Sequence, residues 1–418
     1  MAAVGLACLA QLARGQALEQ AKRAFDAGDY TTAARLFEKA NAGSPRCDTL
    51  LYLGMARYRL HQRDAALIAF QSAVQCDEKL VPAQLALGEA LAERGNDNEA
   101  IASFTRALAL DPHNTAALRG GASVYLRAQA NQQASALLET LVEVEPGDAE
   151  AHADLGAAYV ATGNRERAER QFESALKLKP NLGSGLLGLG SLYVKNAEES
   201  RAIPLLKRAA AAAPQAYEPH YLLGAAYNRL GRYREASVEL LSAVRLGGDE
   251  AEVYYHLARA YGGLGQVEDR RQALARFAEL SRKAKQNVDS QRTALRLMAQ
   301  AKTLVDAGDL EAAMKRMEEA RELRPSDDRL LFRLAGLEFD LQRFNEARGY
   351  VQEAISLSPS EWLYYYLLGL VEKSTDHVPE ARRALEMAIQ LNPAGKEVSQ
   401  ALAELARHEG ESAERPPR

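Results

Sequence analysis

The stretch of sequence most suggestive of chemistry is a G-x-G-x-x-G motif formed by Gly183, Gly185 and Gly188. In dinucleotide-binding sites this motif joins a strand to a helix, and an acidic residue about 20 positions later contacts the ribose. Here it follows FESALKLKP, a segment with helical periodicity and no strand character. We therefore expect no cofactor at these glycines, and expect extra flexibility at this junction.

Histidine, cysteine and acidic residues do not occur at the spacings that reactive sites need. The seven histidines are scattered, with no H-E-x-x-H and no Cys/His cluster at metal-ligand spacing. A G-x-S-x-G elbow, a phosphate loop and kinase motifs are also absent from the sequence. Glu and Arg are frequent on predicted helices, where they suit solvated faces with local ion pairs. The sequence predicts a non-catalytic protein without a metal or a cofactor.

Length and charge narrow the function classes further. The chain has 418 residues and a formal net charge of -4, from 52 Lys and Arg against 56 Asp and Glu. Nucleic-acid-binding proteins normally carry a basic excess, so no nucleic-acid partner is expected. No apolar run reaches the roughly 18 residues that a membrane-spanning helix requires, so no membrane span is predicted. Length alone predicts two or three domains of about 150 residues.

A period of 34 residues replaces that domain count with a repeat count. Units start at residues 47, 81, 115, 149, 183, 217 and 251, resume at 294, 328 and 362 after an irregularity, and are preceded by a weaker unit near 14. Within a unit, position 8 is Gly or Ala in all eleven, and position 20 is Ala in ten, with Arg270 the exception. Eight of the 14 prolines fall at position 32. The chain is therefore an array of eleven similar units.

The spacing within each unit predicts two short antiparallel helices joined by a tight turn. Small residues at positions 8 and 20 let the two helix backbones approach closely. Glycine in a helix interior costs roughly 1 kcal/mol relative to alanine, so its recurrence at position 8 implies a packing requirement. Proline at position 32 ends the second helix of a unit. The predicted fold class is all-α.

These features make the chain resemble the tetratricopeptide repeat (TPR) family over residues 14–394. The resemblance rests on the small-residue positions, Leu-Gly at positions 7 and 8, Tyr at position 11 in five units and the terminal Pro. It implies a right-handed superhelical solenoid of about eleven helix-turn-helix units that acts as a protein-interaction scaffold. The sequence indicates neither the identity of the partner nor the oligomeric state.

The irregularity divides the array. The step from the unit at 251 to the unit at 294 is 43 residues, and the intervening segment lacks the Ala and Pro signature. We expect two lengthened helices that meet near Asn287, with a first block of about eight repeats over 18–285 and a second block of three repeats over 286–394. Residues 395–409 are predicted to form a helix that caps the last repeat. The polar segment 410–418 is predicted to be disordered.

The first 17 residues have two interpretations. Residues 2–13 are nearly all apolar, and Gly15-Gln16-Ala17 offers the small-x-small pattern that signal peptidase cleaves, but no basic residue precedes Arg14. The preferred interpretation is a secretory signal cleaved after Ala17, which predicts a periplasmic or extracellular protein. The alternative is an Ala-rich cap on the first repeat of a cytoplasmic protein.

Cleavage after Ala17 would leave two cysteines, Cys47 and Cys76, at positions 1 and 30 of one unit. An antiparallel helix pair brings these positions side by side, so a disulfide fits the geometry and would suit an oxidising compartment. Two unrelated thiols remain the alternative.

In the TPR family, positions 2, 5, 9, 12 and 13 of each first helix line the concave groove. The resemblance therefore nominates as partner-binding residues Tyr221, Asn228, Arg229, Tyr255, Arg259, Phe332, Phe339 and Tyr366. Apolar anchors among a few polar groups suit an extended peptide or an amphipathic helix. We expect a scaffold that binds such a segment, either in an envelope or secretion assembly or as a cytoplasmic adaptor. The alternative interpretation of the aromatic residues is that their rings only cover neighbouring helices.

Overall fold

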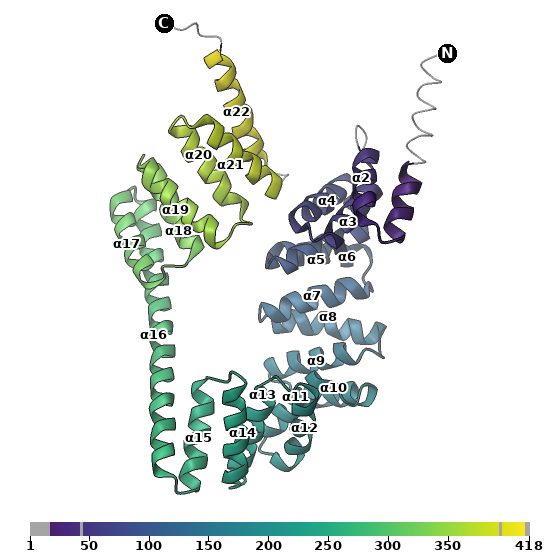
Figure 1. Cartoon of the computed structure of the whole chain (residues 1–418), viewed down its shortest axis with the longest axis vertical. Coiled ribbons are helices and arrows are strands. Elements are labelled where there is room, and N and C mark those ends of the chain that lie inside the picture. The colour runs from purple at the N-terminus through teal and green to yellow at the C-terminus, as the bar shows by residue number, and fades with distance from the viewer. Residues whose placement is uncertain (1–16, 42–44, 393–394, 414–418) are drawn as a thin grey trace. The chain divides into compact units, whose positions relative to one another are not determined.

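The computed structural model describes residues 17–41, 45–392 and 395–413, and within these residues the regular structure is entirely helical (Figure 1). Residues 1–16 of the candidate signal segment 1–17, and the last five residues, 414–418, lie outside the described residues. The chain divides into two compact units between Arg282 and Lys283, close to the boundary predicted at 285. Each unit is described by itself.

Unit 1 is a stack of helix pairs. After a helix over residues 17–26, its second helices are α2 (Tyr30–Asn41), α4 (Arg63–Cys76), α6 (Asp97–Leu110), α8 (Asn131–Val144), α10 (Arg165–Leu178), α12 (Glu199–Ala212) and α14 (Tyr233–Arg245). Its first helices are α3 (Cys47–Arg59), α5 (Val81–Glu93), α7 (Thr115–Arg127), α9 (Ala149–Ala161), α11 (Gly183–Lys195), α13 (Glu218–Arg229) and α15 (Ala251–Gly263). The helices alternate with the 34-residue period of the sequence.

Unit 2 continues the same pattern with fewer repeats. Its helices after α16 are α17 (Leu310–Leu323), α18 (Asp328–Asp340), α19 (Phe344–Leu357), α20 (Trp362–Ser374), α21 (Val378–Leu391) and α22 (Lys396–Ala413). The buried side chains of α22, such as Val398 and Leu405, pack on Leu385 and other buried residues of α21. α22 thus shares a buried cluster with α21.

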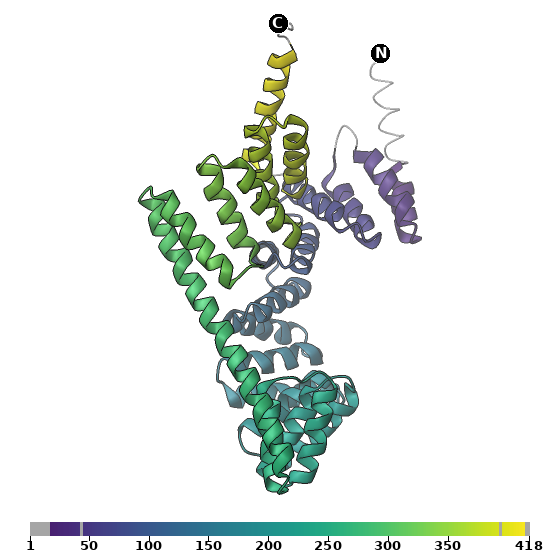
Figure 2. The same ribbon diagram turned by 60° about the vertical axis from the view of Figure 1, so that its left-hand side comes forward.

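The connection between the units differs from the prediction. A single helix, α16 (Val267–Asp306), runs for 40 residues through the position where two helices were expected to meet near Asn287 (Figures 1 and 2). It joins the second helix of one repeat to the first helix of the next. The segment contains neither Gly nor Pro, so nothing in its backbone chemistry ends the helix. Residues 282–289 in its middle are exposed to solvent.

The C-terminal helix is also longer than predicted, because α22 continues through Ala413 although a disordered tail was expected from residue 410. The residues added to the helix are Gly410, Glu411, Ser412 and Ala413, of which only the glycine is a poor helix former. The first proline of the tail, at position 416, comes after the helix.

Glycine recurs at position 8 because the side chain at position 24 of the same repeat fills the space beside it. A Cβ atom on Gly156 would lie 2.8 Å from the ring of Phe172, and one on Gly88 would lie 2.8 Å from Phe104. Both phenylalanines are 2% exposed, so neither ring has room to move aside. The packing requirement inferred from the sequence is therefore a buried side chain, Phe or in other repeats Leu, pressed against a helix backbone.

The same packing explains the G-x-G-x-x-G motif. Gly185 and Gly188 lie inside α11, where a Cβ atom would press on Leu176 and on Phe172 respectively. The preceding segment is helix α10, as expected, so the motif lacks the strand that a dinucleotide site needs. Gly185 and Gly188 thus allow close helix packing.

A left-handed backbone residue ends the first helix of every repeat. Position 15 has a positive φ in all eleven repeats, for example +81° at Gly163 and +62° at Ala197. Glycine adopts this conformation without strain, and the carbonyl groups at the helix end gain hydrogen bonds from it. In five repeats the position is occupied by another residue: His61, Gln129, Ala197, Gln342 and Asp376.

Tyrosines at position 11 tie successive repeats together. The Tyr159 hydroxyl donates to Glu139 of the preceding α8 at 2.6 Å, and the Tyr193 hydroxyl donates to Glu169 of the preceding α10 at 2.9 Å. The Arg201 guanidinium lies 3.9 Å from the centroid of the Tyr193 ring. Such contacts between neighbours stabilise a stack that has no single central core.

Candidate functional site

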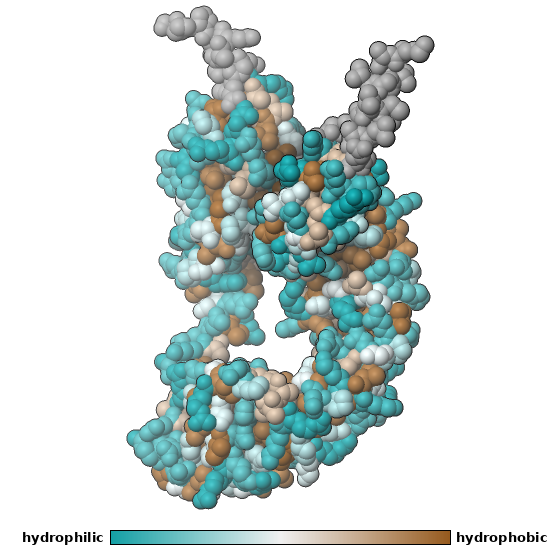
Figure 3. Space-filling view, turned by 45° about the vertical axis from the view of Figure 1, so that its right-hand side comes forward, coloured by the Kyte–Doolittle hydropathy of each residue, from teal (hydrophilic) through white to brown (hydrophobic). Residues whose placement is uncertain are grey.

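The first helices of unit 1 form a layer of their own. α9 contacts α11, α11 contacts α13 and α13 contacts α15, whereas the second helices of these repeats make at most weak contacts with one another. Side chains that point away from the second helices therefore come from neighbouring first helices and share one surface. On the face shown in Figure 3, hydrophilic residues predominate and hydrophobic residues form scattered patches, so hydropathy alone does not mark a binding surface there.

A groove of about 480 Å³ crosses three repeats of this layer. Its floor comes from α9 and α11 and from the Phe172 ring beneath them, and its far side comes from the start of α13. The lining residues are Ala153, Asp154, Ala157, Phe172, Ser184, Leu187, Gly188, Ser191, Tyr217, Glu218, Tyr221, Leu222 and Glu250. We call this space the α9–α13 groove.

The lining follows the repeat register. Ala153, Leu187 and Tyr221 occupy position 5 of three consecutive repeats, and Ala157 and Ser191 occupy position 9 of two. Positions 5 and 9 are among those that the family resemblance nominated for a groove. Because these side chains are short except at Tyr221, the groove is open over α9 and α11.

Tyr221 and Tyr255, two of the nominated residues, lie on either side of His256. The ring centroids of Tyr221 and His256 are 5.7 Å apart, and those of Tyr255 and His256 are 5.4 Å apart. Tyr255 also lies 5.8 Å from Phe277 and is 50% exposed. This row of rings extends the α9–α13 groove towards α15 and offers exposed aromatic area to a partner.

Asn228 and Arg229, also nominated, have structural roles instead. Asn228 is 1% exposed and donates from its Nδ2 to the carbonyl oxygen of His256 at 2.8 Å. Arg229 donates to the carbonyl oxygen of Val194 and pairs with Glu199 at 3.1 Å. Both side chains connect neighbouring repeats, because positions 12 and 13 point between helices here rather than into the groove.

Arg259, the fifth nominated residue of unit 1, faces a separate basic pocket. This pocket of about 340 Å³ is lined by Tyr255, Ala258, Arg259, Gly262, Arg270 and Leu274. Arg270 stands at the position where ten other repeats have Ala. The Arg270 side chain lies 3.5 Å from where a Cβ of Gly262 would be and lines this pocket.

The three nominated residues of unit 2 pack on other rings, Phe339 and Tyr366 within their own repeats and Phe332 against the next repeat. Phe332 lies 5.0 Å from Tyr364, Phe339 lies 5.6 Å from Phe344, and Tyr366 lies 6.3 Å from Trp362, measured between ring centroids. Phe332, Phe339 and Tyr366 are all half-buried. The structure thus gives them packing partners, which was the alternative interpretation of these rings.

Sequence reasoning missed four residues of the site, His256, Asp154, Glu218 and Glu250. The acids fall at unit positions 6, 2 and 34, and no single position signals them. Glu218 stands at position 2, which the family resemblance places in the groove, but only aromatic, asparagine and arginine residues were nominated.

The surroundings shift several pKa values in the site. Desolvation by the groove walls raises the pKa of the Asp154 carboxyl, and the charges of Asp148 and Glu150 add to the effect. The hydrogen bond to Glu250 and partial burial raise the pKa of Tyr217 to about 12. Burial lowers the pKa of His256, helped by the nearby positive charges of Arg259 and Arg229, so the imidazole is neutral at pH 7.

The two cysteines of the unit at 47 form a disulfide. Cys47 begins α3 and Cys76 ends α4, and the two Cα atoms are 5.3 Å apart. The antiparallel helix pair brings its two ends together, which is the geometry expected from the repeat register.

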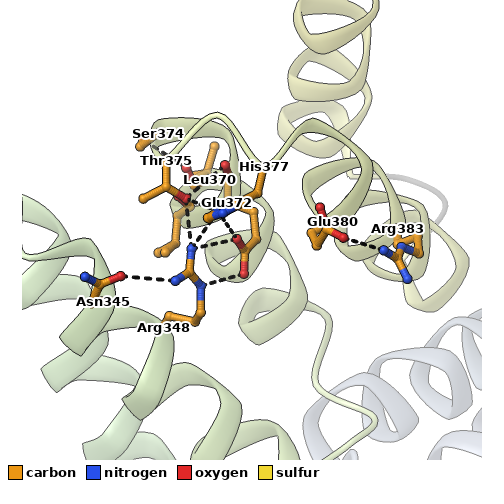
Figure 4. A network of polar contacts seen from close by, with 10 residues as sticks. Asn345, Arg348, Leu370, Glu372, Ser374, Thr375, His377, Glu380 and Arg383 are labelled. Carbon is orange, nitrogen blue, oxygen red and sulfur yellow. Dashed lines mark hydrogen bonds and ion pairs between the residues drawn. The ribbon is translucent and has the colours of Figure 1, made fainter.

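A network of charged side chains in unit 2 is internally satisfied (Figure 4). Arg348 of α19 donates to both carboxylate oxygens of Glu372 at 2.7 and 2.8 Å, and also to Asn345 and Thr375. His377 lies 3.2 Å from the same carboxylate, which is 6% exposed. Because the buried carboxylate is paired, this network connects two repeats and leaves no charge for a ligand.

The described residues lack two other kinds of site. Nowhere among them do three or more His, Cys, Asp or Glu side chains come together in a way that could hold a metal ion. No helix in the described part of the chain is both long enough and apolar enough to span a membrane.

Comparison with known families agrees with this repeat geometry. Models of the tetratricopeptide repeat match residues 18–81, 51–115, 91–153, 251–283 and 298–362. A model of the middle TPR-like domain of cilia and flagella-associated protein 70 matches residues 144–246. The chain belongs to the tetratricopeptide repeat family. Its TPR helix pairs form an all-α repeat solenoid, as the sequence predicted.

Individual similar proteins cover the TPR chain unevenly. The peroxisomal targeting signal receptors of Komagataella phaffii and Komagataella pastoris are each 37% identical over 86 residues, which is 21% of this chain but only 15% of each receptor. A TPR protein from Parabacteroides merdae, of known crystal structure, is 19% identical, with a TM-score of 0.43, over 59% of this chain and 98% of its own. YrrB, described as a TPR protein with an unusual peptide-binding site, is 18% identical, with a TM-score of 0.39, over 45% of this chain and 96% of its own.

Proposed function

We propose that this TPR protein is a non-catalytic scaffold for protein interactions that binds a peptide or helical segment of a partner along the first helices of unit 1. The observation that carries the proposal is the α9–α13 groove, which crosses three repeats and continues into an aromatic row of half-buried Tyr221 and His256 and exposed Tyr255. A groove with short side chains on its floor and aromatic anchors at one end suits a segment several residues long.

A selection for peptide ligands tests this proposal without knowledge of the partner. The purified chain is presented with a phage-displayed library of random peptides of about twelve residues, which span about 40 Å when extended. We expect enriched peptides whose affinity falls by about tenfold or more in Tyr221→Ala and Tyr255→Ala, because exposed aromatic anchors commonly dominate such interfaces.

The matched control is Val238→Ala, which removes an apolar side chain that is 56% exposed on the second helix α14. It should leave peptide affinity unchanged. Equal affinities for all three variants, or the absence of any selected peptide, would reject the groove. Phe332→Ala in unit 2 reports separately whether the rings of that unit contribute to capture of a partner in cross-linking pulldowns.

For the cellular setting, we propose export through the N-terminal segment and a role in an envelope or secretion assembly. The disulfide between Cys47 and Cys76 supports this setting, because disulfides persist mainly in oxidising compartments. The competing proposal is a cytoplasmic adaptor. N-terminal sequencing of protein from native cells separates the two, since a mature end at Leu18 excludes the adaptor and a retained N-terminus rejects cleavage.

A further inference from the structure

The α9–α13 groove combines an apolar floor with an acidic rim. Alanine and leucine side chains of α9 and α11 form the floor, and the rim carries Asp154 of α9, Glu218 at the start of α13 and Glu250 just before α15. No Lys, Arg or His is among the residues that line it. The groove therefore presents three carboxylates and no cation.

These carboxylates lack an ion-pair partner among the described residues. The basic group that most affects Asp154 is Arg119, but this guanidinium pairs with Asp148 at 2.5 Å and with Glu145 at 3.1 Å. Glu250 accepts a hydrogen bond from the Tyr217 hydroxyl, which leaves its charge uncompensated. By contrast, the buried carboxylate of Glu372 is paired with Arg348.

Titration behaviour in the groove agrees with an excess of negative charge. The pKa of the Asp154 carboxyl is raised by desolvation and by neighbouring carboxylates. The pKa of the Tyr221 hydroxyl is raised by burial and by the charges of Glu252 and Glu250. Desolvation, the larger cause in both cases, opposes any charge, but the contribution of the neighbouring carboxylates is one that a positive charge brought into the groove would reverse in sign.

We infer that the α9–α13 groove selects a partner segment that carries a lysine or arginine, whose aliphatic stem lies on the apolar floor and whose charged end reaches Asp154 and Glu218. Lysine and arginine bury their methylene stems along apolar surfaces while the charge stays at a polar rim, which is the arrangement that this groove offers. Complementary charge favours such partners in both association rate and specificity. This inference rests on the proposed peptide-binding function and adds the chemistry of the ligand.

Other ligand chemistries fit less well. The acidic side chains are not grouped closely enough to hold a metal ion, and an anionic ligand would meet three like charges. The pocket lined by Arg259 and Arg270 has the opposite charge, so the preference for a basic residue belongs to the α9–α13 groove and not to the whole surface. The opposite charges of the α9–α13 groove and of this pocket would orient along the stack a partner that places its basic residue in the groove.

The experiment uses the full chain and the same phage-displayed library of random peptides. We expect selected peptides to contain lysine or arginine at a constant spacing from an apolar or aromatic residue. One selected peptide is then synthesised with a fluorescent label, together with an analogue in which norleucine replaces the basic residue. The analogue should bind about tenfold more weakly, and the affinity of the basic peptide should fall as salt is raised.

The acidic rim is tested with Asp154→Asn and Glu218→Gln, which remove charge and keep shape. The matched control is Glu166→Gln, an exposed carboxylate on the second helix α10. Both rim variants should weaken the basic peptide by about fivefold to tenfold and leave the norleucine analogue unchanged, while the control should change neither. Circular dichroism confirms that the variants are folded.

The outcomes separate this inference from the proposed function. Selected peptides without basic residues, or rim variants that bind like the Glu166→Gln control, overturn the inference. If those peptides still depend on Tyr221 and Tyr255, the peptide-binding function stands without it. Binding that appears only with added calcium would assign the acidic rim to a metal ion and would also overturn it. Failure to select any peptide overturns both.

Discussion

Gly369 offers a direct test of the idea that close packing requires glycine at position 8. It lies inside α20, and a Cβ atom there would be 2.6 Å from Leu385 Cγ and 2.7 Å from Leu385 Cδ2. Leu385 is fully buried, so it has no space into which to withdraw. Two other glycines of unit 2, Gly336 in α18 and Gly349 in α19, also lie inside helices but would have no atom within 4 Å of an added Cβ.

The structure sets the sign of each substitution. Replacing a helix-interior glycine by alanine gains about 1 kcal/mol of helix propensity. At Gly336 and Gly349 nothing opposes this gain, so Gly336→Ala and Gly349→Ala should stabilise unit 2. At Gly369 the methyl group must push Leu385 by about 1 Å from contact distance, and overpacking of this kind costs about 1–3 kcal/mol. Gly369→Ala should therefore destabilise the unit by up to about 2 kcal/mol.

The chain contains one tryptophan, Trp362 at the start of α20, so its fluorescence reports the unfolding of unit 2. Urea unfolding of the full chain followed at this residue compares the three variants. For a unit of this size, a difference of about 2–3 kcal/mol between Gly369→Ala and the two controls corresponds to about 1 M or more in the urea midpoint. The controls should move to higher urea and Gly369→Ala to lower urea.

A Gly369→Ala variant that is as stable as Gly336→Ala would refute the reasoning. It would mean that Leu385 repacks at little cost and that glycine at position 8 is not required by contact with position 24. If all three variants lost stability, the assumed gain of about 1 kcal/mol from replacing a helix-interior glycine by alanine would be wrong here.

Three further predictions concern other contacts. Cys76→Ala should lower the unfolding free energy of its repeat by about 3 kcal/mol, because the bond to Cys47 closes a loop of 29 residues. Amide hydrogen exchange measures this loss. In the wild type, unfolded without reduction, thiol titration should find neither Cys47 nor Cys76 reactive. Burial and a hydrogen bond raise the pKa of Tyr350 to about 12. The contribution of this tyrosine to the free energy of unfolding is therefore complete below about pH 10 and should fall by about 1 kcal/mol as the pH rises towards 12. Tyr350→Phe should lack this loss in tryptophan-detected unfolding. Arg348→Met leaves the buried Glu372 carboxylate with only His377, at 3.2 Å, as a possible ionic partner, and should cost about 3 kcal/mol in the same assay. Replacing both Arg348 and Glu372 by apolar residues should restore most of the stability.

The sequence was sufficient for the repeat architecture because each repeat contacts mainly its neighbours. Local features such as Gly at position 8 and Pro at position 32 recur often enough to reveal helix bounds, turns and register without any knowledge of long-range contacts. The same locality explains the failure at α16. α16 is long because no helix-ending residue occurs in 40 positions. The prediction of a break near Asn287 assumed that every repeat ends with such a residue.

The binding surface was only partly predictable. Tyr221 and Tyr255 were nominated from their positions and lie at exposed or half-exposed sites, but Asn228 and Arg229 point between helices and hold neighbouring repeats together. Side-chain direction at the end of a first helix depends on how much the next repeat is rotated, and a one-dimensional register does not contain that rotation.

The sequence by itself determined that this protein is an all-α array of TPR units, since the 34-residue spacing of small residues can be satisfied only by close helix pairs. Tertiary structure decided where charge gathers on that array. Asp154, Glu218 and Glu250 come from three different repeats and three different unit positions, and stacking alone brings them to one groove. Arg119, the arginine whose charge acts on Asp154, pairs with Glu145 and Asp148, and only the three-dimensional arrangement shows this.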